Sequence, residues 1–139
     1  MKLKSPRIYI VDDDQVVILL HKLQVKKQGL FDQTQVFFEA KKALDSIIPL
    51  DSEDQRILIF LDINMPEMNG WEFLTHLQKK IKQADIKVVI VTSSLSKSDK
   101  ENARGFNMVI DFWEKPMVPA QLIKLKEELE DWLGGKTEG

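Results

Sequence analysis

The sequence predicts an α/β protein in three layers, a doubly wound fold in which helices cover both faces of a five-stranded parallel sheet. Short continuous apolar runs, typical of strands buried on both faces, alternate with stretches whose apolar residues recur every three or four positions. Strand and helix alternate five times, as expected for parallel strands joined by right-handed crossovers. The predicted strands span residues 8–11, 36–38, 57–61, 88–91 and 109–113.

The amphipathic stretches between these strands predict five helices, at residues 15–27, 40–48, 71–81, 98–104 and 120–133. Helical spacing predicts that the first helix buries a stripe made of Val16, Leu19, Leu20 and Leu23. The fourth helix has a single apolar residue, Ala103, so we expect it to be the most loosely held. Ser98 and Glu101 have the spacing of a capping box at its start.

Length and composition fit one globular domain, with 139 residues, 43% hydrophobic and 30% charged. The formal net charge of −2 lacks the basic excess of nucleic-acid-binding proteins, so no nucleic-acid partner is expected. The absence of cysteine excludes a disulfide scaffold and a thiolate zinc site. No apolar run has the length of a membrane span, so we expect a cytoplasmic protein with no membrane partner. We expect an N-terminal extension at residues 1–6, one domain at 7–133 and a polar tail at 134–139.

Polar side chains follow the predicted strands where each strand ends. The second strand is followed only by Glu39, which has no matching partner group, and the other four supply the candidate site residues. They are Asp12 and Asp13 after the first strand, Asp62 after the third, Thr92 and Ser93 after the fourth, and Lys115 after the fifth. Open parallel sheets bind ligands beyond the carboxyl ends of their strands. The sequence therefore predicts that these side chains converge at one end of the sheet.

Three carboxylates close together repel one another, and such a cluster either raises a pKa or recruits a cation. Oxygen ligands without histidine or cysteine favour a hard cation, Mg²⁺ or Mn²⁺, that also accepts phosphate oxygens. Lys115 adds a positive charge that can meet a phosphate oxygen, and the hydroxyls add short donors. This set of groups is suited to attack by a carboxylate on phosphorus, with formation of an acyl phosphate.

Four sequence segments carry a family resemblance, namely 11–14 (VDDD), 62–70 (DINMPEMNG), 91–93 (VTS) and 112–116 (FWEKP). In this order and at this spacing they resemble the receiver domain of response regulators in two-component signalling, over roughly residues 7–133. The resemblance implies a flavodoxin-like sheet with strand order 2-1-3-4-5. This sequence departs from the family in two respects. The connection from Gly105 to the fifth strand is longer than usual, and Asp14 and Gln15 follow the acidic pair.

The resemblance implies that Asp62 is the phosphoacceptor. It also implies the ligands of the metal ion. Asp13 and Asp62 would bind the ion directly, Asp12 mostly through water, and Asn64 through its backbone carbonyl.

The same resemblance assigns the groups that meet the phosphoryl group. Thr92 would be a switch hydroxyl with Ser93 beside it, and Lys115 would form an ion pair with the phosphoryl group. Phe112 occupies the family's aromatic switch position and, having no hydroxyl, would signal only by packing.

Three residues have structural roles in the resemblance. Pro116 would follow a cis peptide bond that aims the preceding lysine. Pro66 and Gly70 would shape the loop after the third strand.

Asp14 is expected only to begin the first helix. His21 and His76 are expected at the surface or on helix flanks, with no role as ligand or phosphodonor.

The resemblance implies a histidine kinase or histidine phosphotransfer protein as phosphoryl donor. It also implies an unidentified output protein, reached by contact or onward phosphotransfer through the fourth helix, fifth strand and fifth helix. No enzymatic activity is expected beyond self-phosphorylation and slow self-dephosphorylation.

Alternative functions are a degenerate receiver that acts as a binding module, and an aspartyl-phosphate phosphohydrolase. Asn64 disfavours the hydrolase, because those enzymes resemble a pattern with a second aspartate at this position. A flavin-binding protein of the same topology is disfavoured by three acids where its phosphate-binding loop would lie.

Overall fold

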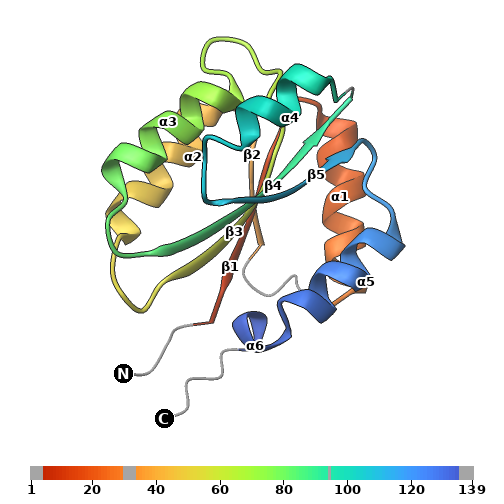
Figure 1. The fold of residues 1–139 in the computed structure, drawn as a ribbon. Coiled ribbons are helices and arrows are strands. Elements are labelled where there is room, and N and C mark those ends of the chain that lie inside the picture. The colour runs from red at the N-terminus through yellow and green to blue at the C-terminus, as the bar shows by residue number, and fades with distance from the viewer. Residues whose placement is uncertain (1–4, 30–33, 94, 135–139) are drawn as a thin grey trace.

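The computed structural model describes residues 5–29, 34–93 and 95–134. It contains a five-stranded parallel sheet in the order β2-β1-β3-β4-β5, as predicted (Figure 1). The strands are β1 (Arg7–Val11), β2 (Thr34–Phe37), β3 (Arg56–Leu61), β4 (Asp85–Thr92) and β5 (Val109–Glu114). The helices are α1 (Gln15–Lys27), α2 (Ala40–Ile47), the short 3₁₀ helix η1 (Ile48–Leu50), α3 (Gly70–Lys80), α4 (Lys97–Ala103), α5 (Pro119–Glu128) and α6 (Glu130–Leu133).

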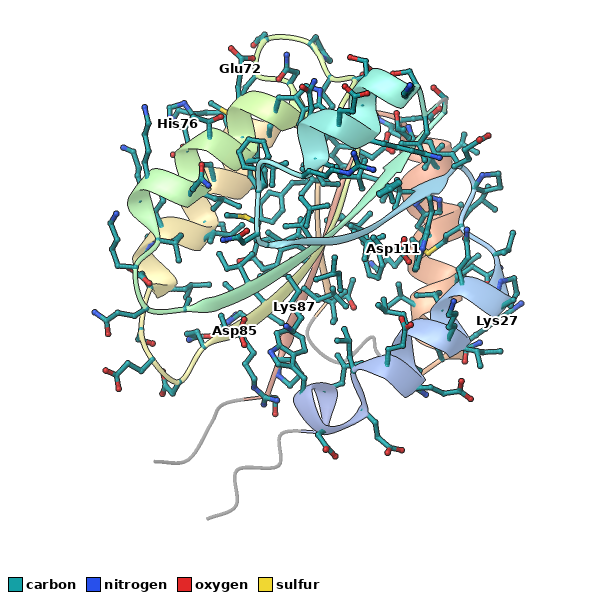
Figure 2. The ribbon with its side chains drawn as sticks, in the orientation of Figure 1. Lys27, Glu72, His76, Asp85, Lys87 and Asp111 are labelled. Carbon is teal, nitrogen blue, oxygen red and sulfur yellow. The ribbon has the colours of Figure 1, made fainter. Side chains whose placement is uncertain are left out.

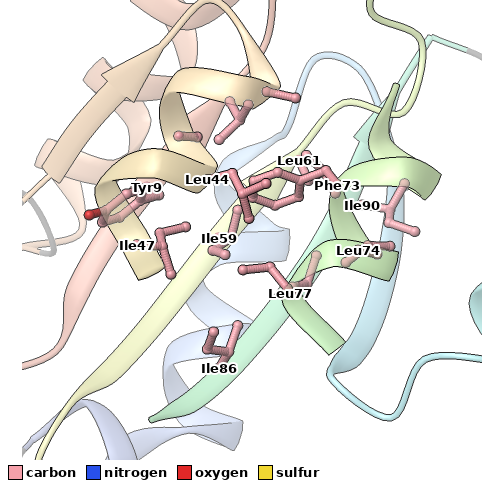
Figure 3. Packing of buried hydrophobic residues seen from close by; sticks show 14 of the residues in the cluster. Tyr9, Leu44, Ile47, Ile59, Leu61, Phe73, Leu74, Leu77, Ile86 and Ile90 are labelled. Atoms are coloured by element: carbon pink, nitrogen blue, oxygen red, sulfur yellow. The ribbon is translucent and has the colours of Figure 1, made fainter. Parts of the chain in front are cut away.

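The sheet separates two hydrophobic clusters. One lies beneath α2, α3 and α4, and the other beneath α1 and α5 (Figure 1). Side chains of β3 alternate between them, so Ile59 and Leu61 face the first cluster and Phe60 faces the second. Phe73 and Leu77 of α3 complete the first cluster (Figure 3). All six residues of β3 are buried, which explains why this strand has no polar alternation in the sequence.

The predicted orientation of α1 is wrong. The stripe expected to be buried is exposed, at 66% for Val16, 58% for Leu19, 45% for Leu20 and 49% for Leu23. The helix instead buries the opposite stripe of Ile18, His21 and Val25. Both stripes have helical spacing, so periodicity alone does not choose between them. Asp14 begins the helix as expected, because its carboxylate accepts hydrogen bonds from the backbone N–H groups of the first turn.

The predicted capping residue of α4 is also wrong, by two residues. The capping box consists of Ser96 and Asp99, with Asp99 N–H donating to Ser96 Oγ at 2.9 Å and Ser96 N–H donating to Asp99 Oδ2 at 3.1 Å. Ser98 and Glu101 have the same spacing but lie inside the helix. Ala103 is the buried residue of α4, as predicted.

The last predicted helix is divided at Leu129 into α5 and α6. Trp132 of α6 donates a hydrogen bond from its indole Nε1 to Asp85 Oδ2 at 2.7 Å, and its carbonyl accepts a hydrogen bond from Arg56. The ammonium of Lys87 lies 5.4 Å from the centroid of the Trp132 ring, and Figure 2 shows Asp85 and Lys87 near α6. The break therefore lets α6 fold back against the amino ends of β3 and β4.

Strand β5 contains a bulge next to the long connection that precedes it. Val109 pairs with Val88 and Asp111 pairs with Val89, which leaves Ile110 as an extra residue, 40% exposed. Val109 and Phe112 both pack on the first cluster although they are three positions apart, where regular alternation would place them on opposite faces. The extra residue makes this possible, because it shifts the alternation of side chains between the two faces.

Within the described residues, no helix combines the length and apolar character needed to cross a membrane.

Candidate functional site

The site lies where β1 and β3 end, because their pairing brings two acids together. Val11 pairs with Leu61, and the next residue of each strand is an aspartate. Asp62 N–H donates to the carbonyl of Val11 at 3.0 Å, which extends the ladder by one bond. Carboxylate oxygens of Asp12, Asp13 and Asp62 all lie within 4.8 Å of one another. The predicted convergence of these acids is therefore present.

Lys115 lies between two of the carboxylates. Its Nζ is 2.8 Å from Asp12 Oδ2 and 3.1 Å from Asp62 Oδ2. Burial alone would lower the pKa of Lys115, but hydrogen bonds and charges from Asp12 and Asp62 outweigh it and raise that pKa. Burial raises the pKa of Asp12, against the opposing effects of Lys115 and of the Asp14 N–H that donates to its carboxylate. One ammonium is thus shared by two acids that are each only 3% exposed at the side chain.

Asp13 differs from the other two acids because it is exposed. No basic side chain of the described residues forms an ion pair with it. Three carboxylates facing one ammonium leave the cluster with an excess of negative charge. Its oxygen-only donors fit Mg²⁺ or Mn²⁺, so Asp12, Asp13 and Asp62 are the side chains that could hold such an ion.

Asn64 connects the acid of β3 to the end of β4. Its backbone N–H donates to Asp62 Oδ1 at 3.0 Å, and its side-chain Nδ2 donates to Thr92 Oγ1 at 3.0 Å. Thr92 is fully buried, whereas Asn64 is exposed. The Thr92 hydroxyl therefore lies at the site in a hydrogen bond with Asn64.

A pocket of about 460 Å³ opens over this arrangement. It is lined by Asp13, Asp14, Val17, Leu20, Asp62, Asn64, Ser93, Lys115 and Pro116. Ser93 therefore borders the pocket, as its position after β4 predicted. Phe112 does not line it. Its half-buried ring packs on the first cluster, with the Lys100 ammonium 5.4 Å from the ring centroid.

The loop after Asp62 closes tightly on its own start, just beyond β3. Gly70 N–H donates to the carbonyl of Ile63 at 3.1 Å, and a Cβ on Gly70 would lie 2.6 Å from the Cα of Ile63. Any larger residue here would displace backbone, which accounts for the glycine. Pro66 is exposed within the loop, and Glu67 has a positive φ of 65°. The loop thereby fixes the position of the Asn64 amide.

The peptide bond between Lys115 and Pro116 is cis, as predicted.

His21 is a residue that sequence reasoning missed. It was expected at the surface, but it is 1% exposed and its Nε2 accepts a hydrogen bond from Met117 N–H at 3.1 Å. Burial, and to a smaller extent the charge of Lys115, lowers the pKa of His21 to about 4. The neutral ring can therefore act as an acceptor at neutral pH. No local signal marks this role, because Met117 lies 96 residues away in the chain. His76, on α3, is partly buried.

Comparisons with known proteins agree with the fold. A model of the family described as response regulator receiver domain matches residues 8–127. The chain is 33% identical to a chemotaxis protein CheY homolog of Campylobacter jejuni over 137 residues, covering 96% of this chain and 97% of that protein.

Solved structures show the same architecture. A two-component response regulator from Legionella pneumophila has 28% identity and a TM-score of 0.72, with 91% of this chain and 99% of that chain covered. A two-component response regulator from Cytophaga hutchinsonii has 22% identity and a TM-score of 0.79, with 92% of this chain and 98% of that chain covered. Because the identity is low, this second similarity supports the fold alone. The chain belongs to the response regulator receiver domain family of two-component signalling.

Burial of neutral His21 leads to a prediction about pH and stability. Its folded-state pKa of about 4 lies below the ordinary value of 6.5, so between these values the unfolded chain binds a proton that the folded chain does not. We expect the free energy of unfolding to fall as pH is lowered from about 6.5 to about 4, with about 3 kcal/mol due to this residue. His21→Leu should lack that component in urea unfolding without added metal.

Equal pH dependence in wild type and His21→Leu would contradict the assignment.

Proposed function

We propose that this receiver is a phosphoacceptor in a histidine-to-aspartate phosphorelay, in which Asp62 takes the phosphoryl group. The observation that carries the proposal is the position of Lys115, 2.8 Å from Asp12 and 3.1 Å from Asp62, beside the third carboxylate of Asp13. An ammonium in hydrogen-bond contact with the acceptor carboxylate is placed to meet a phosphoryl oxygen there.

In the proposed step, an oxygen of the Asp62 carboxylate attacks the phosphorus of a phosphohistidine. An O–P bond forms, the P–N bond breaks, and its electron pair returns to the donor imidazole. Lys115 and Ser93 line the same pocket, and in this step they stabilise the developing negative charge. No general base is required, because the nucleophile is already an anion.

We propose that Mg²⁺, or Mn²⁺ in its place, binds through the carboxylates of Asp13 and Asp62, the carbonyl of Asn64, and a water molecule held by Asp12. When bound, the ion neutralises charge on the phosphoryl oxygens. The excess of carboxylates over ammonium groups in the cluster supports this assignment, because repulsion among the acids falls when a cation binds.

The proposed output is a switch at α4, β5 and α5 that an unidentified partner protein reads. Thr92 would exchange its bond from Asn64 for one to the phosphoryl group. Phe112 then repacks against the first cluster and changes the surface near Lys100 and Ile110. Such a change is a shift between two states biased by the phosphoryl group. We infer a cytoplasmic location and no activity beyond self-phosphorylation and slow self-dephosphorylation.

The exposed stripe of α1 supports the assignment of a protein as phosphoryl donor. It is continuous at i, i+3, i+4 and i+7, and comprises Val16, Leu19, Leu20 and Leu23. Leu20 also lines the pocket that contains Asp62. A contiguous exposed apolar surface is typical of a protein interaction site. We propose that a histidine kinase or histidine phosphotransfer protein docks its phosphohistidine-bearing helix here.

The acceptor role of Asp62 is tested by mass spectrometry after incubation with acetyl phosphate and Mg²⁺. We expect wild type to gain one phosphoryl group and Asp62→Asn to gain none, because the amide is not a nucleophile. The matched control is Asp14→Asn, which removes a neighbouring charge and leaves a good helix cap. Labelling of Asp62→Asn would overturn the assignment. An unlabelled wild type would favour the degenerate binding module, and sustained phosphate release would favour the phosphohydrolase.

The metal site is tested by unfolding at increasing Mg²⁺. An ion that binds only the folded state raises the free energy of unfolding by about 2.7 kcal/mol when its free concentration is a hundred times the dissociation constant. We expect Asp13→Asn to weaken affinity at least tenfold and so remove about 1.4 kcal/mol of that stabilisation at equal metal concentration. Asp14→Asn is again the control. Equal Mg²⁺ dependence in Asp13→Asn and wild type would count against the site.

The docking stripe is tested with the kinase or phosphotransfer protein that phosphorylates wild type fastest. We expect the Leu19→Gln/Leu23→Gln double variant to be phosphorylated at least about tenfold more slowly by that protein, because apolar contact is lost. Its labelling by acetyl phosphate should be unchanged, since glutamine adds no charge and is a good helix former. Ile110→Gln, on the far edge of the sheet, is the control. Equal slowing with both donors would refute docking through this stripe.

A further inference from the structure

His21 reaches from the buried face of α1 to the segment that follows Lys115. Its Nε2 accepts the hydrogen bond of Met117 N–H at 3.1 Å, and both residues are almost fully buried, at 1% and 2% exposure. The contact joins α1 to the connection between β5 and α5. None of the roles described above for the phosphoryl group, the metal ion or the output face uses this histidine.

The neighbouring backbone bonds show why this contact matters for the segment. Lys115 N–H donates to the carbonyl of Thr92 at 2.8 Å, and Pro116 has no N–H to donate. Val118 N–H donates to Gln121 Oε1 at 2.9 Å within the cap of α5. Between β5 and α5, the buried amide of Met117 is therefore satisfied by His21. A buried amide left without an acceptor is costly, so the segment would move if His21 lost its ring nitrogen.

Movement of this segment would displace Lys115, whose ammonium is held in the site by two short contacts. The 2.8 Å and 3.1 Å distances to Asp12 and Asp62 hold only while the lysine backbone keeps its place. One anchor is the bond to Thr92 on the strand side, and the other is the bond to His21 two residues later. A displacement of about 1 Å at a group that meets a transition state costs as much as a hundredfold in rate.

We propose that His21 is a positioning residue for phosphoryl transfer, acting through the Met117 amide to hold Lys115 against the acceptor carboxylate. The inference rests on the proposed function and adds to it a residue outside the pocket. His21 touches neither the phosphoryl group nor the metal ion. Its loss should therefore slow phosphorylation without weakening the binding of Mg²⁺ to the three acids.

The test compares three variants of His21 that differ in where they place an acceptor. Glutamine can place its amide oxygen near the position of Nε2, asparagine is too short to do so, and leucine has no acceptor. We measure the rate of labelling by acetyl phosphate at saturating Mg²⁺, and separately the Mg²⁺ dissociation constant by metal-dependent unfolding. We expect His21→Asn and His21→Leu to be labelled between about ten and a hundred times more slowly than wild type. His21→Gln should recover most of the rate, and none of the three variants should bind Mg²⁺ more weakly than wild type.

A residue that only fills the core would give a different pattern. Equal rates for the glutamine and asparagine variants, or wild-type rates for all folded variants, would overturn the positioning role. The glutamine and asparagine variants test the positioning role even if His21→Leu does not fold. Both side chains end in a polar amide and differ in whether that amide can reach the Met117 N–H. A loss of Mg²⁺ affinity that parallels the loss of rate would also overturn the positioning role. It would mean that the substitution disturbs the three metal-binding carboxylates and not only Lys115. Failure of wild type to be labelled would instead refute the proposed function itself.

Discussion

The ion pairs of Lys115 with Asp12 and Asp62 are the interaction on which the site depends. Parallel pairing of Val11 with Leu61 forces the two following aspartates together at the sheet end, where both are nearly buried. Two adjacent carboxylates in such a place are unfavourable without a cation. One ammonium satisfies both and cannot also neutralise the third acid of the cluster. The remaining negative charge is the electrostatic reason that the cluster fits a divalent ion, and the shared ammonium is the group that a phosphoryl group would meet.

Delivery of Lys115 to these acids depends on the bulge in β5. The extra residue, Ile110, shifts the alternation of the strand, so Phe112 faces the cluster beneath α4 and Trp113 faces the cluster beneath α5. The ladder then continues through the strand end, where Lys115 N–H bonds the carbonyl of Thr92. Without the extra residue, a different side chain would reach this position. The long connection before β5, which departs from the family resemblance, thus joins a strand that still brings its lysine to the site.

The acids and the lysine could be predicted from sequence because each lies just beyond the end of a strand, and strand ends are visible in the apolar runs. The face that α1 buries could not be predicted in this way. Its two apolar stripes both have helical spacing, and the more apolar one is exposed. The choice depends on tertiary contacts such as the bond between His21 and the amide of Met117, which no local pattern contains. The same ambiguity affects α4, because Ser96 with Asp99 and Ser98 with Glu101 have equal spacing. Periodicity identifies an element, but long-range contacts set its rotation and its end.

Helix α1 therefore has two faces with different tasks. Leu20 points outward in the exposed stripe and lines the pocket of Asp62, while His21 points inward and bonds the segment that carries Lys115. A helix this short, 13 residues, moves largely as one body, so a shift of one face is also a shift of the other. In the proposed function a donor bound to the stripe contacts the same rigid element that anchors the lysine segment. Burial of a histidine at this position is then explained by the acceptor it provides, which a leucine or valine lacks.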